Sequence, residues 1–115
     1  MPMTYSPRAQ SFRYRNADCP KNVLAIYDNG GTSADRYTVI YKTLIEGPHG
    51  QLWLGLRAMN AQPSHPQYGI ALYAQYRVHE IAAYRDRSRR HACRWTDLPP
   101  TVQACVRLDC TPLPS

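Results

Sequence analysis

Two hydrophobic runs rich in β-branched and aromatic residues, at 23–27 and 37–41, lie on either side of a polar segment that contains a pair of glycines. Such side chains pack well on a pleated surface, whereas Gly and Asn accept the backbone angles of a tight turn. The pattern predicts two paired strands joined by the segment from Asp28 to Arg36. Loose alternation over 51–59, after the turn-forming segment 46–50, predicts a third strand and an antiparallel meander.

The hydrophobic residues from 70 to 81 fit two periods. One subset, which includes Leu72 and Tyr76, alternates as in a strand, and another, which includes Tyr73 and Ile81, recurs near helical spacing. The run is longer than a typical strand and contains no Gly or Pro, which favours a helix. The arginine-rich segment 84–94 is expected to form an exposed loop, and a short strand is expected at 92–95.

The last element predicted is a helix from about Pro99 to Asp109. A preceding Asp or Thr can cap its first N–H groups, Pro is tolerated in a first turn, and Val102 and Val106 lie on one face. The fold class is therefore α+β: a small antiparallel sheet, a meander of three or four strands, packed against a C-terminal helix. Residues 21–111 are expected to form a single domain between a flexible basic N-terminal tail, 1–20, and a C-terminal tail, 112–115.

Charge indicates the kind of partner. The 115-residue chain has 14 Lys+Arg against 8 Asp+Glu, a formal net charge of +6, and all but two of its cationic residues are arginines. A planar guanidinium can bind a phosphate or carboxylate through two hydrogen bonds, so this bias favours an anionic partner, nucleic acid or an acidic protein surface. Solubility alone would also explain the charge. The candidate surface for such a partner is the densest group of arginines: Arg85, Arg87, Arg89, Arg90 and Arg94.

A second candidate site lies in the segment between the first two strands. Paired glycines let a ligand approach backbone N–H groups closely, and an Asp beside an Arg can orient a polar molecule. The ligand-binding residues expected there, with a histidine from a later loop, are Asp28, Asn29, Gly30, Gly31, Asp35, Arg36 and His65. The alternative is an ordinary hairpin whose Asp and Asn bond their own backbone while Arg36 pairs with Asp28 or Asp35.

The cysteines point to no metal centre. There are four cysteines and four histidines but no Cys-x-x-Cys pair, so a zinc site would require the fold to gather Cys19, His91 and Cys93. No metal, cofactor or catalytic residue is expected, and Cys105 is expected to pack in the core. The chain begins with no apolar signal segment and contains no hydrophobic run of membrane-spanning length, which predicts a cytoplasmic protein with reduced thiols and no membrane partner.

Several short motifs occur in a recognisable order. They are Asp28-Asn29-Gly30-Gly31, then 35–39 (DRYTV), then His65-Pro66-Gln67 and finally 97–99 (DLP). This order resembles that of a family of small proteins carried by phages, plasmids and other bacterial mobile elements, over residues 20 to 110. The family brings no assigned reaction. The resemblance therefore implies a mobile-element origin and nothing catalytic.

These observations give a leading functional hypothesis and two others. The first is a small, basic, non-enzymatic binding protein that engages an anionic partner, nucleic acid or an acidic host protein, to counter or modulate a host system. The second is a protein that binds and sequesters a nucleotide or small molecule through the Asp28–Arg36 loop. An enzyme using His65 and an acid is the third, but no second catalytic group lies at a recognisable spacing. The oligomeric state stays open.

Overall fold

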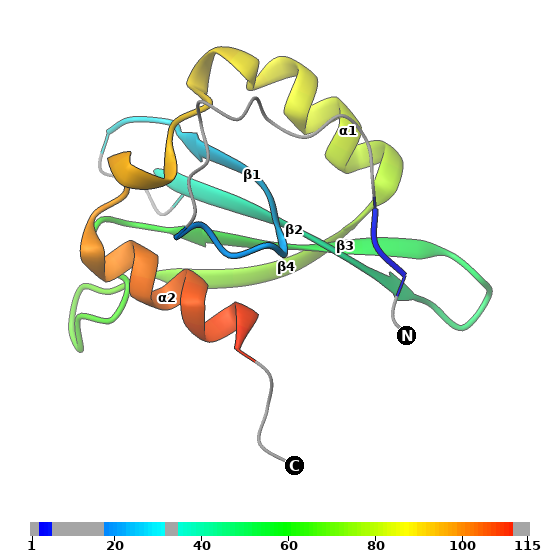
Figure 1. Cartoon of the computed structure of the whole chain (residues 1–115), viewed down its shortest axis with the longest axis horizontal. Coiled ribbons are helices and arrows are strands. Elements are labelled where there is room, and N and C mark those ends of the chain that lie inside the picture. Colours follow the sequence, from blue (N-terminus) through cyan, green and yellow to red (C-terminus); the bar gives the residue numbers. More distant parts are fainter. Residues whose placement is uncertain (1–2, 6–17, 32–34, 112–115) are drawn as a thin grey trace.

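The computed structural model describes residues 3–5, 18–31 and 35–111. These residues form a four-stranded antiparallel sheet in the order β1-β2-β3-β4, a helix, two short 3₁₀ turns and a second helix. The expected α+β meander is confirmed (Figure 1). The bounds are β1 Val23–Asp28, β2 Tyr37–Glu46, β3 Leu52–Met59, β4 Ala71–Arg77, α1 Val78–Arg87, 3₁₀ turns at Arg89–His91 and Trp95–Asp97, and α2 Pro100–Cys110.

The two helices cover opposite faces of the sheet, α1 above it and α2 below it in Figure 1. Ile81 of α1 packs with Leu24, Ile40 and Leu54 on one face. On the other face lies the larger hydrophobic cluster, built from Cys19, Val23, Ile26, Tyr37, Val39, Tyr41, Met59, Trp95, Leu98, Val102 and Val106. Because β1 and the first half of β2 are buried on both faces, their sequences are almost uniformly apolar.

The segment 70–81 is a strand followed by the first turn of a helix, so the expectation of one helix is wrong for Ala71–Arg77. Every residue of β4 is in register with β3, which satisfies backbone groups that a helix would otherwise have bonded internally. The helix begins where Glu80 Oε1 accepts a hydrogen bond from the Arg77 N–H, at 3.1 Å. The alternating pattern therefore belongs to β4, and the helical spacing belongs to α1, which follows it directly.

The segment 84–94 is not an exposed loop. Helix α1 continues to Arg87 because half-buried Tyr84 packs against the same cluster as Ile81, and a 3₁₀ turn at Arg89–His91 follows. The strand expected at 92–95 is also absent from the described chain: Ala92 forms one isolated bridge with Tyr27, and Trp95 begins the next 3₁₀ turn. Trp95 is 1% exposed, so its indole belongs to the core under α2.

Helix α2 runs from Pro100 to Cys110, one residue later at each end than predicted. Val102 and Val106 are fully buried and Cys105 packs against them. From the same helix Asp109 binds Arg57 of β3, with 2.6 Å between the Arg57 Nη2 and Asp109 Oδ1 atoms, and accepts a hydrogen bond from the Tyr41 hydroxyl. Burial and the adjacent carboxylate raise the pKa of Tyr41. A polar link thus supplements the hydrophobic contact between α2 and the sheet.

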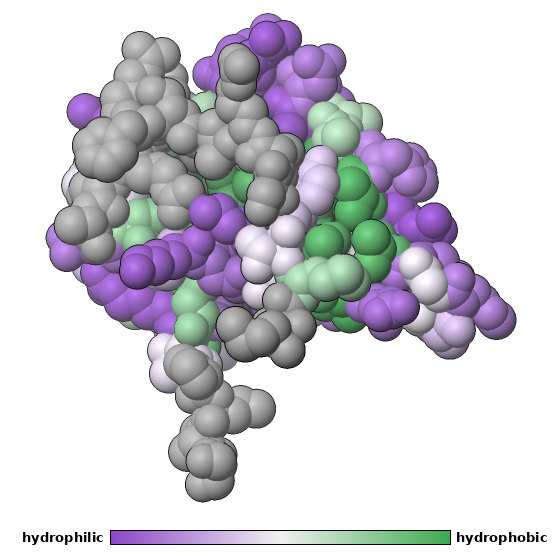
Figure 2. All heavy atoms as spheres, turned by 45° about the vertical axis from the view of Figure 1, so that its right-hand side comes forward, coloured by the Kyte–Doolittle hydropathy of each residue, from purple (hydrophilic) through white to green (hydrophobic). Residues whose placement is uncertain are grey.

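The terminal segments are described only in part. Residues 3–5 lie along β2, where the Tyr5 N–H donates to the Lys42 carbonyl at 2.7 Å and the Leu44 N–H donates to the Met3 carbonyl at 2.8 Å. The rest of the expected N-terminal tail up to residue 17, and the expected C-terminal tail 112–115, lie outside the described residues. No helix in the described part of the chain is long and apolar enough to cross a membrane. Figure 2 shows that the most hydrophobic residues of the visible face gather to the right of its centre, with hydrophilic residues around them.

A pair of leucine variants tests the core beneath α2. Leu98 is 4% exposed and packs with Trp95, so Leu98→Ala is expected to lower the free energy of unfolding by about 2–5 kcal/mol. Leu108 is 75% exposed, and Leu108→Ala is the matched control, with an expected change within about 0.5 kcal/mol. Urea denaturation followed by tryptophan fluorescence measures both, and an equal destabilisation by the two substitutions would contradict the packing described.

Candidate functional site

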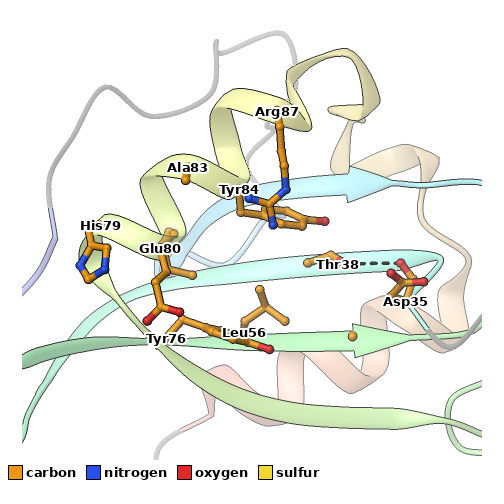
Figure 3. A pocket seen from close by; sticks show the side chains of 11 residues that line it. Asp35, Thr38, Leu56, Tyr76, His79, Glu80, Ala83, Tyr84 and Arg87 are labelled. Carbon is orange, nitrogen blue, oxygen red and sulfur yellow. Dashed lines mark hydrogen bonds between the residues drawn. The ribbon is translucent and has the colours of Figure 1, made fainter.

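A groove lies between α1 and the sheet where the helix does not cover β3 and β4 completely. Its volume is about 470 Å³, within the range of small-molecule sites. Leu56 and Ile81 supply its apolar walls, and Figure 3 shows Arg87 reaching from α1 toward Tyr84 while Glu80 points toward Tyr76. The described residues that line it are Asp35, Thr38, Leu56, Ala58, Tyr76, His79, Glu80, Ile81, Ala83, Tyr84 and Arg87.

Tyr84 is fixed in this groove by the predicted loop. The Asn29 side-chain amide donates to the Tyr84 hydroxyl at 3.2 Å and to the Asp35 carbonyl at 2.8 Å. The Tyr84 ring meets Tyr27 edge to face, with 5.4 Å between the ring centroids. The guanidinium of Arg87 lies over the Tyr84 ring, 5.1 Å from its centroid. One side of the groove is therefore held in place by contacts between the loop, β1 and α1.

The other residues of the Asp28–Arg36 loop make the contacts of the hairpin alternative. The Gly30 N–H donates to Asp28 Oδ1 at 2.9 Å, and Arg36 Nε lies 3.4 Å from the same oxygen. Gly30 and Gly31 have φ of 76° and 74°, the region that glycine enters without strain. Residues 32–34 lie outside the described part. Among the described residues of this loop, Asp35 lines the groove.

His65 stabilises its own loop. Its Nδ1 atom accepts hydrogen bonds from the N–H groups of Gln67 and Tyr68, at 3.1 and 3.0 Å, and its ring stacks on Tyr68. A shallow hollow of about 220 Å³ lies between Tyr68 and the hairpin residues Gly31 and Arg36. The structure thus brings the two predicted loops side by side, although His65 reaches this hollow only through Tyr68.

The five candidate arginines do not form one uniform surface. Arg85 is half-buried near Tyr27, where burial raises the pKa of the Tyr27 hydroxyl and the positive charge of Arg85 offsets part of that rise. Arg94 makes two hydrogen bonds to the Asp97 carboxylate, at 3.2 and 3.1 Å, which lower the pKa of Asp97. Both side chains are therefore engaged within the protein.

The remaining arginines of this group are exposed at the C-terminal end of α1. Arg89 pairs with Asp86 at 3.4 Å, but both side chains are about 80% exposed and such pairs contribute little. The Arg90 Nε atom lies 3.4 Å from the His91 imidazole, and Arg87 lies over the Tyr84 ring. The guanidinium groups of this segment that can turn toward an anion are those of Arg87, at the end of α1, and of Arg89 and Arg90, in the turn that follows it. These three residues are called the α1 arginines below.

The four cysteines are buried or half-buried thiols. None of Cys19, Cys93, Cys105 and Cys110 forms a disulfide. Burial raises the pKa of Cys93 to about 12 and that of Cys110 to about 11, so both thiols stay protonated near neutral pH. Cys105 packs against the hydrophobic cluster under α2, as expected. In the described ranges, no three or more His, Cys, Asp or Glu side chains are placed to hold a metal ion.

Sequence reasoning missed most of the groove because Tyr76, His79 and Glu80 lie in the segment with two periods. The available signal was Glu80 three residues after Arg77, which is the spacing of a reciprocal cap at a helix start. A strand that ends at Arg77 places Tyr76 on the sheet and Tyr84 on the helix that packs over the sheet, which are the two sides of the groove. No family model, curated protein or solved structure matches this chain.

The buried thiols predict slow alkylation. Thiolate is the reactive form, and an exposed cysteine has a pKa of about 8.5. Iodoacetamide at pH 8.5 is expected to modify both Cys93 and Cys110 at least about 100-fold more slowly in the folded protein than in urea, with the larger effect at Cys93, as measured by peptide mass spectrometry. Equal alkylation rates in both states would contradict the burial of these two thiols.

The same pKa shifts predict how stability depends on pH. The thiols of the unfolded chain ionise first, so the free energy of unfolding should fall as pH rises from about 8.5 toward 11 and 12.

Proposed function

We propose that this chain is a small, non-enzymatic protein that binds nucleic acid through the α1 arginines. The observation that carries the proposal is their exposure at one end of α1, on a chain whose formal net charge is +6. Arginine binds phosphate oxygens in a planar, bidentate manner, so several such groups close together suit a phosphate backbone. An acidic protein surface offers similar groups and is the alternative partner.

The position of these arginines also limits the affinity. Positive side chains at the C-terminal end of a helix are attracted by the helix dipole, which offsets part of their field on an anion. Binding is therefore expected to come from the release of counterions at a few phosphate contacts, without base reading. Affinities of about 10⁻⁴ to 10⁻⁶ M at physiological salt are typical of such contacts. The resemblance to mobile-element proteins supports a role that modulates a host system.

A second candidate function uses the groove under α1. Its size suits a nucleotide or a similar small molecule, its apolar walls would receive a ring, and Arg87 at its edge would meet an anionic group. Asp35 and Glu80 add hydrogen-bond acceptors for ligand N–H or O–H groups. Because Asp35 belongs to the predicted ligand loop, this candidate retains one residue of the site expected from the sequence.

A triple substitution tests nucleic-acid binding. Arg87→Ser, Arg89→Ser and Arg90→Ser together are expected to weaken binding to duplex DNA nearly equally for all sequences. They should also flatten the dependence of log K on log salt by about 0.9 for each phosphate that the variant no longer neutralises. Fluorescence anisotropy from 50 to 200 mM salt, about the range over which such binding weakens, measures both effects.

The control for this test is the pair Arg107→Ser and Lys21→Ser, which removes exposed positive charge outside the α1 arginines. All variants should unfold within about 1 kcal/mol of the parent, because exposed charges contribute little and the cation–π contacts of Arg87 and Arg107 contribute about 0.5–1 kcal/mol each at exposed sites. A triple variant with the parent's affinity and salt slope would refute the proposal. If the parent binds neither duplex nor single strands at low salt, the acidic protein surface becomes the partner to pursue.

Thermal denaturation in the presence of nucleotides tests the groove. A ligand at a hundred times its dissociation constant is expected to stabilise the fold by about 2.7 kcal/mol. Ala83→Phe should abolish that shift by filling the groove, whereas Ala82→Phe, also at an exposed position of α1 but outside the groove lining, should preserve it. A flat response to every nucleotide in the parent would remove the second candidate.

A further inference from the structure

The outer edge of β4 is the open edge of the sheet in the described part of the chain. At the opposite edge, Ala92 bridges to Tyr27 and the Cys93 N–H donates to the Ile26 carbonyl at 3.1 Å, so β1 is covered. Where β2 extends beyond β1, residues 3–5 pair with it. An edge strand presents unpaired N–H and C=O groups, which form a template for another strand.

The hydrogen bonds of β4 show which backbone groups are open. The Asn60 N–H donates to the Ile70 carbonyl at 3.1 Å, and in an antiparallel pair the direction alternates, so Tyr73 and Gln75 turn their backbone groups away from β3. One outward group at each end of the strand has a side-chain partner. Arg57 Nη1 donates to the Ala71 carbonyl at 3.3 Å, and the Arg77 N–H donates to Glu80. Between these two ends, the open groups are those of Tyr73 and Gln75, symmetric about Ala74.

The strand carries none of the usual protection against pairing. Its sequence, ALYAQYR, has no Pro, Gly, Lys or acidic residue, and its register with β3 runs without a bulge. The positive side chain of Arg77 lies over the Trp53 ring and therefore does not extend outward from the edge of the sheet. Leu72, Tyr73 and Tyr76 are 58%, 47% and 40% exposed, so much of the exposed large apolar surface in the described chain gathers on β4.

We propose that β4 pairs antiparallel with β4 of a second copy of this chain, about a two-fold axis at Ala74. In this register the N–H and carbonyl of Tyr73 form hydrogen bonds with the carbonyl and N–H of Gln75 in the second copy. By symmetry, Gln75 pairs with Tyr73 of the second copy in the same way, so every open group of both residues is satisfied. Leu72 lies opposite Tyr76 of the second copy on the α1 face, a cross-strand apolar contact made twice. The two sheets become one continuous sheet, with an α1 helix of each copy on the same face.

A second copy fits this edge better than a partner chosen by charge. Residues 71–76 carry no ionisable group except tyrosine, so the edge offers nothing to attract an acidic peptide. The open groups lie symmetrically about one residue, as an isologous interface requires. Since each copy carries a formal charge of +6, self-association should tighten as salt screens their repulsion. Nucleic-acid binding should weaken under the same change, which separates the two proposals experimentally.

Disulfide trapping tests the register. Directly opposite residues of a non-hydrogen-bonded pair have Cα atoms about 4.5 Å apart, within the reach of a disulfide. Ala74→Cys is therefore expected to give a covalent dimer when copper–phenanthroline and air oxidise the thiols. Leu72→Cys, on the same face of the same strand, faces Tyr76 of the second copy and should not. The parent, with its native cysteines, is oxidised in parallel as the background.

Sedimentation provides an independent measurement. The parent should show a concentration-dependent monomer–dimer equilibrium that shifts toward dimer at high salt. Gln75→Pro removes an outward N–H without breaking the β3–β4 ladder and should shift the equilibrium to monomer, with circular dichroism confirming the fold. A parent that remains monomeric at every concentration and salt, or Leu72→Cys that cross-links as fast as Ala74→Cys, would overturn the proposal. If Gln75→Pro fails to fold, the cysteine pair still decides the question.

Discussion

The burial of β1 and the first half of β2 on both faces is the constraint on which the rest of the structure depends. Val23 to Tyr27 and Tyr37 to Tyr41 are each at most 5% exposed. A sheet with apolar side chains on both faces needs a layer on each side, since exposed hydrophobic surface costs about 25 cal/mol per Å². The chain supplies these layers with α1 on one face and with Trp95 and α2 on the other.

Each layer is fixed to the sheet by polar contacts as well as by apolar ones. Under α2, the carboxylate of Asp109 binds both Arg57 and Tyr41, which sets the position of the helix along the strands. Over the other face, Asn29 links the hairpin to Tyr84 of α1. Hydrogen bonds have directional requirements that apolar contacts lack, so these links select one placement of each helix. The second link also shapes one side of the groove.

The surface left by this arrangement has three regions, which overlap at Tyr76 and Arg87. Helix α1 packs mainly over β1 to β3, which leaves the groove beside it and the apolar residues of β4 exposed. The α1 arginines extend beyond the end of the same helix. A dimer through β4 would place two grooves and two sets of α1 arginines on the same face of one sheet. Such duplication would raise avidity for an extended anionic partner by holding two weak sites together.

The sequence by itself determined the elements whose local signals agree. The apolar runs and the Gly-containing turn determined the β1–β2 hairpin, and Pro99 with the spacing of Val102 and Val106 determined α2 to within one residue at each end. The hairpin contacts of Asp28 and Arg36, expected from the sequence as the alternative to a ligand site, are also present. These features form from contacts between residues that are close in the chain, so a local sequence pattern is enough to predict them.

Only the tertiary structure decided the boundary at Arg77, the burial of Arg85 and the groove. The spacing of apolar residues over 70–81 fits both a strand and a helix. Residues 71–77 form a strand because they pair with β3, which lies well before them in the chain. In the sequence Arg85 is one of several arginines close together, and its half-buried place near Tyr27 depends on the packing of α1 over β1. Tyr76 and Tyr84 line one groove because β4 and α1 diverge at a point that Glu80 caps. Contacts between residues distant in the chain carry no local pattern, because their energy exists only once the layers have packed.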